Sequence, residues 1–465
     1  MIEGECAAPA PGALAEEVAA VLADRRDPGV VTYERLLNAV VGHCHADREA
    51  LAAALCGIPR EQRVRPHRAV WSVGAVVAAA VGPVRAEEYG ENAGAGWLEL
   101  CQHVALDYVA DARTVEVTAR VRTGDTVPFL LSAPSRATGA VEPHDLVRRL
   151  AEYARLGVRP GPADLGQALL RCGGPVDPAA VRAAERLGTE EAPRVADWLR
   201  GGGLPQPVWW RDRESGAAER PSRRRGARAG RRILVGHEAI EGRGAFPRRF
   251  WSLFRTFEPH IGCAHASMPD DRDAHTVAVL PWHPEIAAAR LLTGVASAAD
   301  QNGPGAPGFL EALAAADGPA GPAVHLAVAY GLAAAPERER EEAVRALVRL
   351  GARGALDGEL LGRELVELVG LGTLKAALLG ESLRTAVAAP QGAPAVWAVL
   401  APALPGLLAC TPAQVHGLLL GVAADAAHLS GARGALPEVT ALAQRPGSSR
   451  LLKEARRLRD TLAAG

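Results

Sequence analysis

Aromatic residues are scarce in this chain. Phe, Trp and Tyr make up 4% of its 465 residues, while apolar residues of all kinds make up 48%. A core built from small and aliphatic side chains favours packed helices over a sheet-rich fold. Net charge is also nearly absent, at -1, so the chain as a whole has no electrostatic attraction to nucleic acid or to an acidic membrane. The length exceeds that of one compact core and predicts several units.

Cysteine pairs and targeting signals are missing too. The seven cysteines are scattered and include no Cys-x-x-Cys, which argues against a disulfide framework and a zinc ribbon. The N-terminus carries Glu3 and Glu5 and lacks the basic region and apolar run of a signal peptide. We expect no membrane span, because no uncharged apolar stretch of about 18 residues stands out. A soluble cytoplasmic protein is the resulting prediction.

Common catalytic motifs are also absent. The sequence has no Gly-x-Ser-x-Gly elbow, no phosphate loop ending in Gly-Lys-Ser/Thr and no dinucleotide-binding glycine motif. His237-Glu238 begins like the helix of a zinc protease, but Glu241 stands where the second histidine belongs. We therefore predict no catalytic residue and no cofactor, and the balance leans against an enzyme.

A repeated phrase is the most informative feature that is present. Gly351–Leu356 and Gly431–Leu436 both read GARGAL, 80 residues apart, and Pro390-Gln391-Gly392 lies halfway between them. Two steps of 40 residues match the length of a two-helix repeat of the HEAT or armadillo type, which has roughly 40–47 residues. Apolar residues from about 323 onward recur at helical spacing. Residues 323–465 are therefore predicted to form a HEAT/armadillo-like α-solenoid, which makes a binding surface.

The rest of the chain divides by its periodicity. Residues 1–110 have helical spacing, and residues 111–210 are expected to form a small module of a hairpin and helices. In that module Thr114–Val121 alternates apolar and polar residues and Val127–Leu131 follows a turn, which predicts a β-hairpin. Residues 211–232 are rich in arginine and read as a linker. The predicted fold class is therefore mostly α, with a helical N-terminal region, a small β-hairpin in the middle and the solenoid at the C-terminus.

The region 233–322 is irregular, and its short apolar runs leave two alternatives open. Ile233–Val235 and Thr276–Leu280 fit either short strands or buried turns. Pro402 and Pro405 are expected to end or kink the helix that begins near Ala395.

Three phrases carry a resemblance to a known family. They are FLLSAPSRATG at Phe129–Gly139, VLPWHP at Val279–Pro284, and the segment from Arg353 to Leu462, which includes GSSRL at Gly447–Leu451. Together they resemble an uncharacterised actinobacterial family of large helical-repeat proteins. Its members are often encoded near SWIM zinc-finger proteins, MoxR-type AAA ATPases and von Willebrand A proteins. The resemblance covers about 125–465 and implies a shortened member, with an AAA ATPase or a SWIM zinc-finger protein as partner and no catalytic motif.

Two groups of residues have the chemistry of metal ligands. His260, Cys263, His265 and His275 cluster in a loop-like region, which can gather ligands, although an ordinary loop with surface histidines is the simpler interpretation. His43, Cys44 and His45, with Cys56, have suitable residue types but no standard spacing, since neighbouring residues on a helix point to different faces. We expect polar residues at a helix end in that second case.

Other residues are candidates for binding a partner. Trp282 and His283 are held by flanking prolines, which suits either a recognition loop or a structural plug, and the plug is favoured. Trp209 and Trp210 face opposite ways in an extended segment, so one of them is a candidate anchor for a partner. The arginines of 220–232 could bind phosphates weakly, but a solvated linker is the simpler interpretation and nucleic acid is not expected as a partner.

Three functional hypotheses follow. The leading one is a non-enzymatic helical-repeat scaffold or adaptor that binds a protein partner. The alternative is a metal-dependent enzyme or metal-binding module centred on 260–283. The third hypothesis is weak nucleic-acid binding through the arginine-rich segment.

Overall fold

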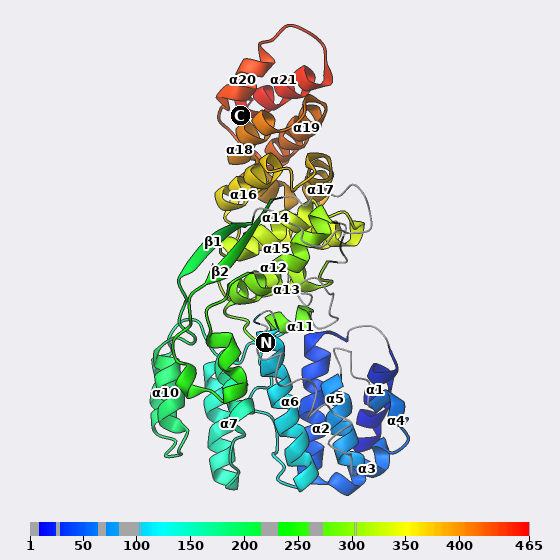
Figure 1. Ribbon diagram of the computed structural model, residues 1–465, viewed down its shortest axis with the longest axis vertical. Coiled ribbons are helices and arrows are strands. Elements are labelled where there is room, and N and C mark those ends of the chain that lie inside the picture. Colours follow the sequence, from blue (N-terminus) through cyan, green and yellow to red (C-terminus); the bar gives the residue numbers. More distant parts are fainter. Residues whose placement is uncertain are drawn as a thin grey trace.

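The protein is mostly helical, with a small two-stranded antiparallel hairpin in the middle of the chain, and this part of the predicted fold class is confirmed. The computed structural model describes residues 9–24, 28–63, 71–82, 102, 104–214, 231–259, 273–301, 303 and 305–464. The molecule is elongated, with a block of N-terminal helices at one end and a stack of C-terminal helices extending from it (Figure 1).

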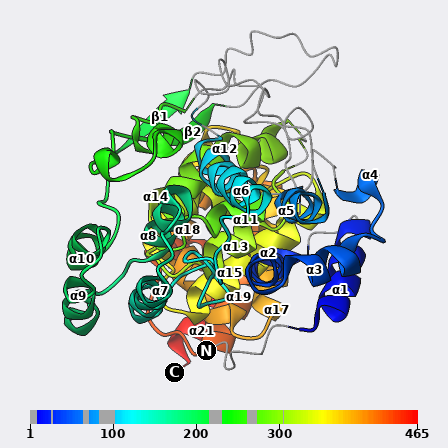
Figure 2. The ribbon, with the colours of Figure 1, turned by 90° about the horizontal axis from the view of Figure 1, so that it is seen from below.

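Within the described residues, ten helices form the N-terminal block, which Figure 2 shows from the end of the molecule. They are α1 (Pro11–Ala23), α2 (Gly29–Ala46), α3 (Arg48–Leu55), α4 (Arg60–Arg63), α5 (Trp71–Val81), α6 (Ala105–Thr123), α7 (Pro143–Leu156), α8 (Pro162–Arg171), α9 (Pro178–Glu185) and α10 (Ala192–Arg200). Proline begins α7, α8 and α9, at the position where a helix needs no N–H partner. Asp177 accepts hydrogen bonds from two backbone N–H groups as the expected N-cap of α9.

The hairpin predicted at Thr114–Val121 is wrong. This segment lies inside α6, and Val127–Leu131 has no regular structure. The alternation is misleading because Thr114 and Thr118 are buried, at 2% and 4% exposure. The four buried residues of this segment are Thr114, Val117, Thr118 and Val121. Their spacing of i, i+3, i+4 and i+7 is that of one face of a helix. Helix α6 also crosses the expected domain boundary at 110/111, so that boundary is corrected.

The observed hairpin lies further along the chain. Strand β1 (Trp209–Glu214) pairs antiparallel with β2 (Arg232–His237), and Trp209 stands opposite His237. The expected linker at 211–232 is therefore corrected, because both of its ends pair within one hairpin; residues 215–230 lie outside the described residues. Of the two alternatives at 233–235, the strand is right. Two short 3₁₀ helices follow, η3 (Arg243–Ala245) and η4 (Arg248–Phe254).

Helices α11 to α21 form the stack. Their bounds are α11 (Asp273–Val277), α12 (Pro284–Asp300), α13 (Phe309–Ala315), α14 (Pro322–Leu332), α15 (Glu337–Ala352), α16 (Gly358–Gly370), α17 (Ala376–Ala388), α18 (Gly392–Cys410), α19 (Ala413–Ser430), α20 (Pro437–Ala443) and α21 (Arg450–Ala463). Helices α12, α14, α16 and α18 contact one another in order, and α11, α13, α15, α17, α19 and α21 do the same. The stack is thus two rows of helices, and it begins before the expected boundary at 323. Residues 276–280 are the end of α11 and a turn, not a strand.

Close packing through glycine joins helices within one row. A Cβ atom on Gly358 of α16 would lie 2.4 Å from the carbonyl oxygen of Ala398 on α18, and one on Gly406 of α18 would lie 2.7 Å from Val366 of α16. The prolines Pro402 and Pro405 were expected to end or kink the helix; α18 continues through both, so the first alternative is wrong and the kink stays a prediction. Packing against α16, α17 and α19 holds α18 together despite its missing N–H groups.

Helix α18 also corrects the expectation about membrane spans. It has 19 residues, contains no charged residue and is long and apolar enough to cross a membrane by these two criteria. In this fold it packs against α16 and α19. The core helices of soluble proteins satisfy the same criteria.

The repeated hexapeptide occupies corresponding corners of the stack. Gly351–Leu356 connects α15 to α16, and Gly431–Leu436 connects α19 to α20. The left-handed residue that ends the helix is Gly354 in the first copy, with φ of +70°, and Gly431 in the second, with φ of +65°. The two copies of the hexapeptide therefore end their helices at different glycines. Either glycine can do so, because glycine adopts positive φ values without a steric penalty.

Candidate functional site

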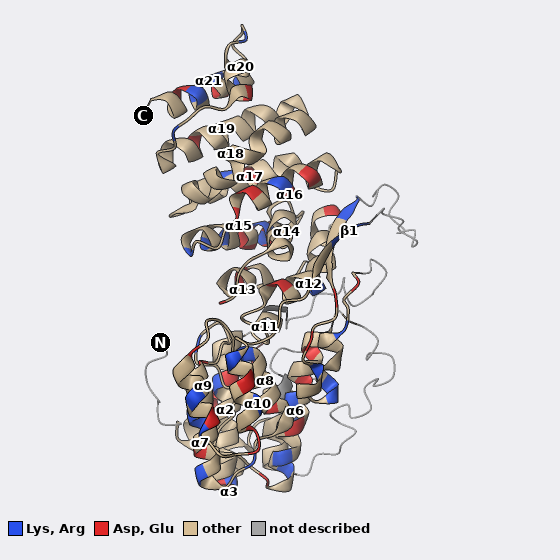
Figure 3. Cartoon of the chain, turned by 90° about the vertical axis from the view of Figure 1, so that its left-hand side faces the viewer, with Lys and Arg blue, Asp and Glu red and all other residues tan. Residues whose placement is uncertain are grey.

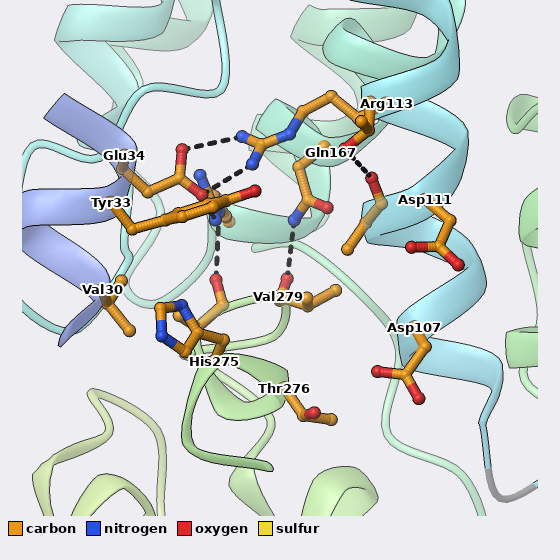
Figure 4. A pocket seen from close by; sticks show the side chains of 14 residues that line it. Val30, Tyr33, Glu34, Asp107, Asp111, Arg113, Gln167, His275, Thr276 and Val279 are labelled. Atoms are coloured by element: carbon orange, nitrogen blue, oxygen red, sulfur yellow. Dashed lines mark hydrogen bonds and ion pairs between the residues drawn. The ribbon is translucent and has the colours of Figure 1, made fainter. Parts of the chain in front are cut away.

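A cavity lies where the block meets the stack. Its walls come from α2, α6 and α8 of the block and from α11 and the turn after it, and its volume is about 510 Å³ including the part open to solvent (Figure 4). The lining residues are Val30, Tyr33, Glu34, Asp107, Ala110, Asp111, Arg113, Thr114, Gln167, Arg171, His275, Thr276, Ala278 and Val279. The sites of binding and catalysis in proteins are usually concave places of this kind, where separate units join.

A buried ionic network forms the base of this cavity. Glu34 of α2 accepts two hydrogen bonds from Arg113 of α6, at 2.9 and 2.7 Å, and one from Arg171 of α8, at 2.6 Å. All three side chains are 2–3% exposed. Bidentate pairs of this type fix the relative orientation of the elements that carry them. The network therefore ties three helices of the block together.

Asp164 and Ser132 extend the network. The Ser132 hydroxyl accepts a hydrogen bond from Arg113 at 2.9 Å and donates one to Asp164 at 2.5 Å. Asp164 also accepts the backbone N–H of Leu131 at 2.7 Å. Two carboxylates thus face two guanidinium groups, and the buried charges balance, as buried ionic groups must.

The network controls the protonation of Glu34. Burial alone would raise the pKa of this carboxyl, but the positive charges of Arg113 and Arg171 and their hydrogen bonds outweigh burial and lower its pKa to about 2. Beside it, burial raises the pKa of Tyr33 to about 12. Glu34 is therefore ionised and Tyr33 neutral at any physiological pH. Neither group is tuned for proton transfer near neutrality.

The same network reaches across to the stack. Arg171 donates from Nε to the carbonyl of Ala278 at 3.0 Å, and Gln167 donates from Nε2 to the carbonyl of Val279 at 3.1 Å. Both carbonyls belong to the turn that follows α11. Helix α8 thus holds the first turns of the stack by hydrogen bonds between groups that are fully buried.

Of the first group of possible metal ligands, His260, Cys263, His265 and His275, only His275 lies within the described residues. It lines the cavity, and its ring centroid is 5.2 Å from that of Tyr33. His260, Cys263 and His265 lie outside the described residues. Across the described part of the chain, no three His, Cys, Asp or Glu side chains are placed to hold a metal ion. The metal hypothesis therefore stays a prediction.

The second group of possible metal ligands diverges. His43 contacts the carbonyl of Pro9 through Nε2 at 2.8 Å, while His45 contacts the hydroxyl of Thr126 at 3.3 Å. Cys44 is buried and Cys56 is exposed. The four residues of this group have separate surroundings. His237, the start of the zinc-protease-like phrase, ends strand β2 and lies in no helix.

Trp282 and His283 lie at the contact between block and stack. The Trp282 ring covers Gly173 and Gly174, where added Cβ atoms would lie 2.8 and 2.5 Å from it, and Arg136 stacks over the ring at 5.8 Å. His283 is 6% exposed and accepts a hydrogen bond from Gln206 at 3.1 Å. Burial lowers the pKa of His283 to about 4. Both side chains contact residues of the same protein, which favours the structural plug over the recognition loop. A partner-binding role for these two residues stays a prediction.

Trp209 and Trp210 are both half-buried in β1. Trp209 packs on the ring of His237 at 5.2 Å, and Trp210 covers Gly236 so closely that an added Cβ would lie 2.5 Å from it. Neither ring is fully exposed, which fits packing within the protein, and a partner-binding role for Trp209 and Trp210 stays a prediction. The arginines 223–225 lie outside the described residues.

Comparison of the chain with protein-family models, with curated proteins and with solved structures finds no match. The cavity is therefore interpreted from its own chemistry. In the network at its base, Glu34 is paired with Arg113 and Arg171. The Ser132 hydroxyl has Asp164 and Arg113, and not a histidine or lysine, as its hydrogen-bond partners in this network. Such a group of residues holds helices in place and can bind a ligand, but it lacks an activated nucleophile.

Proposed function

We propose that the protein is a non-enzymatic scaffold whose helical stack, of the HEAT-like repeat type, binds another protein. The observation that carries this proposal is an uncharged face on the stack. No Asp, Glu, Lys or Arg occurs between Arg384 and Asp425, a segment that includes all of α18 and the first two-thirds of α19. Figure 3 shows the contrast between this region and the charged surface of the N-terminal block.

Much of that face is exposed. Pro394, Ala398, Pro402 and Ala409 follow one side of α18 at helical spacing and are all exposed, and Trp397 beside them is half-buried. Depletion of charge in the centre of a surface patch and the presence of Trp are features of protein interfaces. The face lies on α18, in the row that also contains α12, α14 and α16, and solenoids bind partners through surfaces built from such rows of helices.

The partner is proposed from the sequence resemblance. An AAA ATPase of the MoxR type or a SWIM zinc-finger protein is the first candidate, because members of the resembled family are often encoded beside such proteins. Gln167 and Arg171 of α8 hold the turn after α11 by hydrogen bonds, and such a connection between block and stack suits a scaffold that positions a partner. No observation favours nucleic acid as the partner, since the candidate segment for it lies outside the described residues.

The test is co-purification of the tagged protein with each candidate partner, in the wild type and in a variant with two charges on the α18 face. Pro402→Glu and Ala409→Lys place two charges in the face. Both are compatible with the helix: Glu supplies the backbone N–H that proline lacks, and Lys is favourable near the C-terminus of a helix. We expect a stoichiometric complex with the wild type and its loss with the variant.

The matched control has the same two charges on the other row. Ala377→Glu and Ala388→Lys lie at exposed positions of α17, so the complex should survive. If no stoichiometric protein partner is recovered, or if the α18 variant retains it fully while remaining folded by circular dichroism, the proposal is rejected.

A further inference from the structure

The contacts of β2 show which backbone groups of the hairpin point outward. In an antiparallel pair, the N–H and C=O of one residue point to the same side of the strand, and this side alternates along the chain. On β2, His237 uses both groups in hydrogen bonds with the backbone of Phe257, at 3.1 and 2.8 Å. Ile233 uses both groups in hydrogen bonds with the Tyr330 hydroxyl, at 2.9 Å each. Residues 233, 235 and 237 of β2 therefore point away from β1.

The register of the hairpin transfers this alternation to β1. Trp209, Arg211 and Arg213 stand opposite those three residues of β2, so their own N–H and C=O groups point away from β2. Among the described residues, these outward groups have no hydrogen-bond partner. Figure 1 and Figure 2 both show β1 on the outer side of β2, away from α12. Strand β1 therefore presents an edge with three donors and three acceptors.

The arginines along this edge do not protect it with unpaired charge. Arg211 donates to the two carboxylate oxygens of Glu364 at 2.7 and 2.8 Å and to Glu367 at 2.9 Å, and Arg213 also pairs with Glu367. Proteins commonly protect an edge strand with free charges or with proline. Trp209–Glu214 contains no proline, and Val208 just before it is 62% exposed. This edge is therefore suited to pairing with another strand.

The edge is complementary to a second copy of itself. When two β1 strands pair antiparallel around a twofold axis at Arg211, Trp209 of each copy stands opposite Arg213 of the other. The three outward N–H groups of each copy then donate to the three outward carbonyls of the other. A shift of the register leaves some of these groups unpaired. The centred register also places an indole ring beside a guanidinium group, which is a favourable cross-strand pair.

We propose that the protein forms a symmetric dimer through the outer edges of its β1 strands. The two hairpins then make one four-stranded antiparallel sheet in the order β2, β1, β1, β2. A twofold dimer uses the same surface on both copies, as this pairing does, and strand addition to an open edge is an established mode of recognition. The inference goes beyond the proposed scaffold function, because the dimer carries two α18 faces.

The dimer is expected to be weak. Each copy contributes a single short strand, so the interface is smaller than that of a permanent dimer, and we expect a Kd of about 1–100 µM. The charge of Arg211 does not oppose the pairing strongly, although Arg211 of the second copy lies opposite it. Each of these guanidinium groups is held by Glu364 and Glu367 of its own chain.

The experiment is sedimentation velocity of the full-length protein between about 1 and 300 µM, with hydrogen exchange measured on the same samples. We expect the protein to change from monomer to dimer over this range, and the amides of Trp209, Arg211 and Arg213 to become protected in the dimer. A monomer at every concentration overturns the proposal and leaves the edge for a strand of another protein. A dimer in which exchange of these amides is unchanged overturns it too, because its interface lies elsewhere.

Two substitutions at one position separate the backbone from the side chain. Arg213→Pro and Arg213→Ala both lose the exposed ion pair with Glu367, but only proline removes the outward N–H. Because position 213 points away from β2, both variants keep the hydrogen bonds of the hairpin. We expect Arg213→Ala to dimerise within about fivefold of the wild type, and Arg213→Pro, which loses two hydrogen bonds per dimer, at least about tenfold more weakly than Arg213→Ala.

Equal dimerisation of the two folded variants contradicts the proposal. Circular dichroism checks that each variant is folded. If Arg213→Pro does not fold, the exchange of the β1 amides in the wild type and in Arg213→Ala decides. Protection that rises with concentration in both supports the dimer, and its absence in either rejects it.

Discussion

The place where the block meets the stack, formed by α2, α6, α8 and α11 and called the joint below, and the upper stack hold their helices together by opposite means. At the joint, Glu34, Arg113 and Arg171 connect three helices through charged hydrogen bonds of 2.6–2.9 Å. In the upper stack, α16 and α18 approach through Gly358 and Gly406, with no charged residue on α18. Charged hydrogen bonds depend on direction and on partners, while close packing depends on volume. The joint should therefore be sensitive to changes of charge and the stack to changes of size.

The largest expected effect is the loss of Glu34. Glu34→Gln keeps the volume but leaves Arg113 and Arg171 buried without their carboxylate, so we expect a loss of about 3–5 kcal/mol in the free energy of unfolding. Denaturant unfolding followed by circular dichroism measures it. The matched control is Glu381→Gln on α17, where the side chain is 47% exposed and paired with Arg384; it should cost less than about 1 kcal/mol. Equal losses in both variants would contradict the comparison.

The next effect tests volume in the stack. Gly358→Ala places a methyl group 2.4 Å from the Ala398 carbonyl oxygen, so we expect a loss of about 1–3 kcal/mol in stability from overpacking. Gly370→Ala is the control on the same helix, because its nearest neighbour is a Cβ atom at 3.9 Å; it should be neutral or slightly stabilising. Gly358→Ala should therefore lower the thermal midpoint, whereas Gly370→Ala should leave it unchanged or raise it slightly. A similar destabilisation in both would show that helix propensity, not close approach, controls these positions.

The smallest effect is a difference in pH dependence. On α15, burial and then the charge of Glu342 raise the pKa of Glu339 to about 7. A raised carboxyl pKa means that its contribution to stability is complete below the ordinary value of 4.5 and is lost as pH rises through 7. The contribution of Glu34 has the opposite sign: it is present above pH 4.5 and lost as pH falls toward 2.

Stability measured at pH 5 and pH 8 distinguishes the two groups. Glu339→Gln should remove part of the loss that the wild type shows between these values, because its amide does not ionise. Glu341→Gln, at an exposed position of the same helix, serves as the control and should leave the loss unchanged. A wild-type loss that Glu339→Gln does not reduce would mean that other groups cause it.

The sequence predicted the helices well where apolar spacing was regular, as at Leu361, Leu365 and Leu368, which are all fully buried on α16. It failed at α6 because the core there includes threonine, which a hydrophobic pattern counts as polar. It also failed at α18, because neighbouring helices stabilise a helix that two prolines weaken. Such tertiary effects are not encoded in local periodicity.

The cavity was harder to predict, because its residues are far apart in the chain. Glu34, Arg113 and Arg171 each resemble an ordinary surface charge in the sequence. One signal was present: Arg113 follows Leu106 and Val109 on an apolar face of α6. A charge within an apolar stripe predicts a buried partner, but it does not say which of the chain's 53 acidic residues the partner is.

The hairpin has a mechanical consequence. It is fastened to three successive helices of one row: Arg232 pairs with Asp300 on α12, the backbone of Ile233 binds the Tyr330 hydroxyl on α14, and Arg211 pairs with Glu364 on α16. These fastenings end at α16 and the Thr373 turn after it. A pulling force applied at the C-terminus would therefore detach α21 to α17 one after another. To detach α16 it would then have to break the attachments of the hairpin, which connect α12, α14 and α16 and share the force among these three helices.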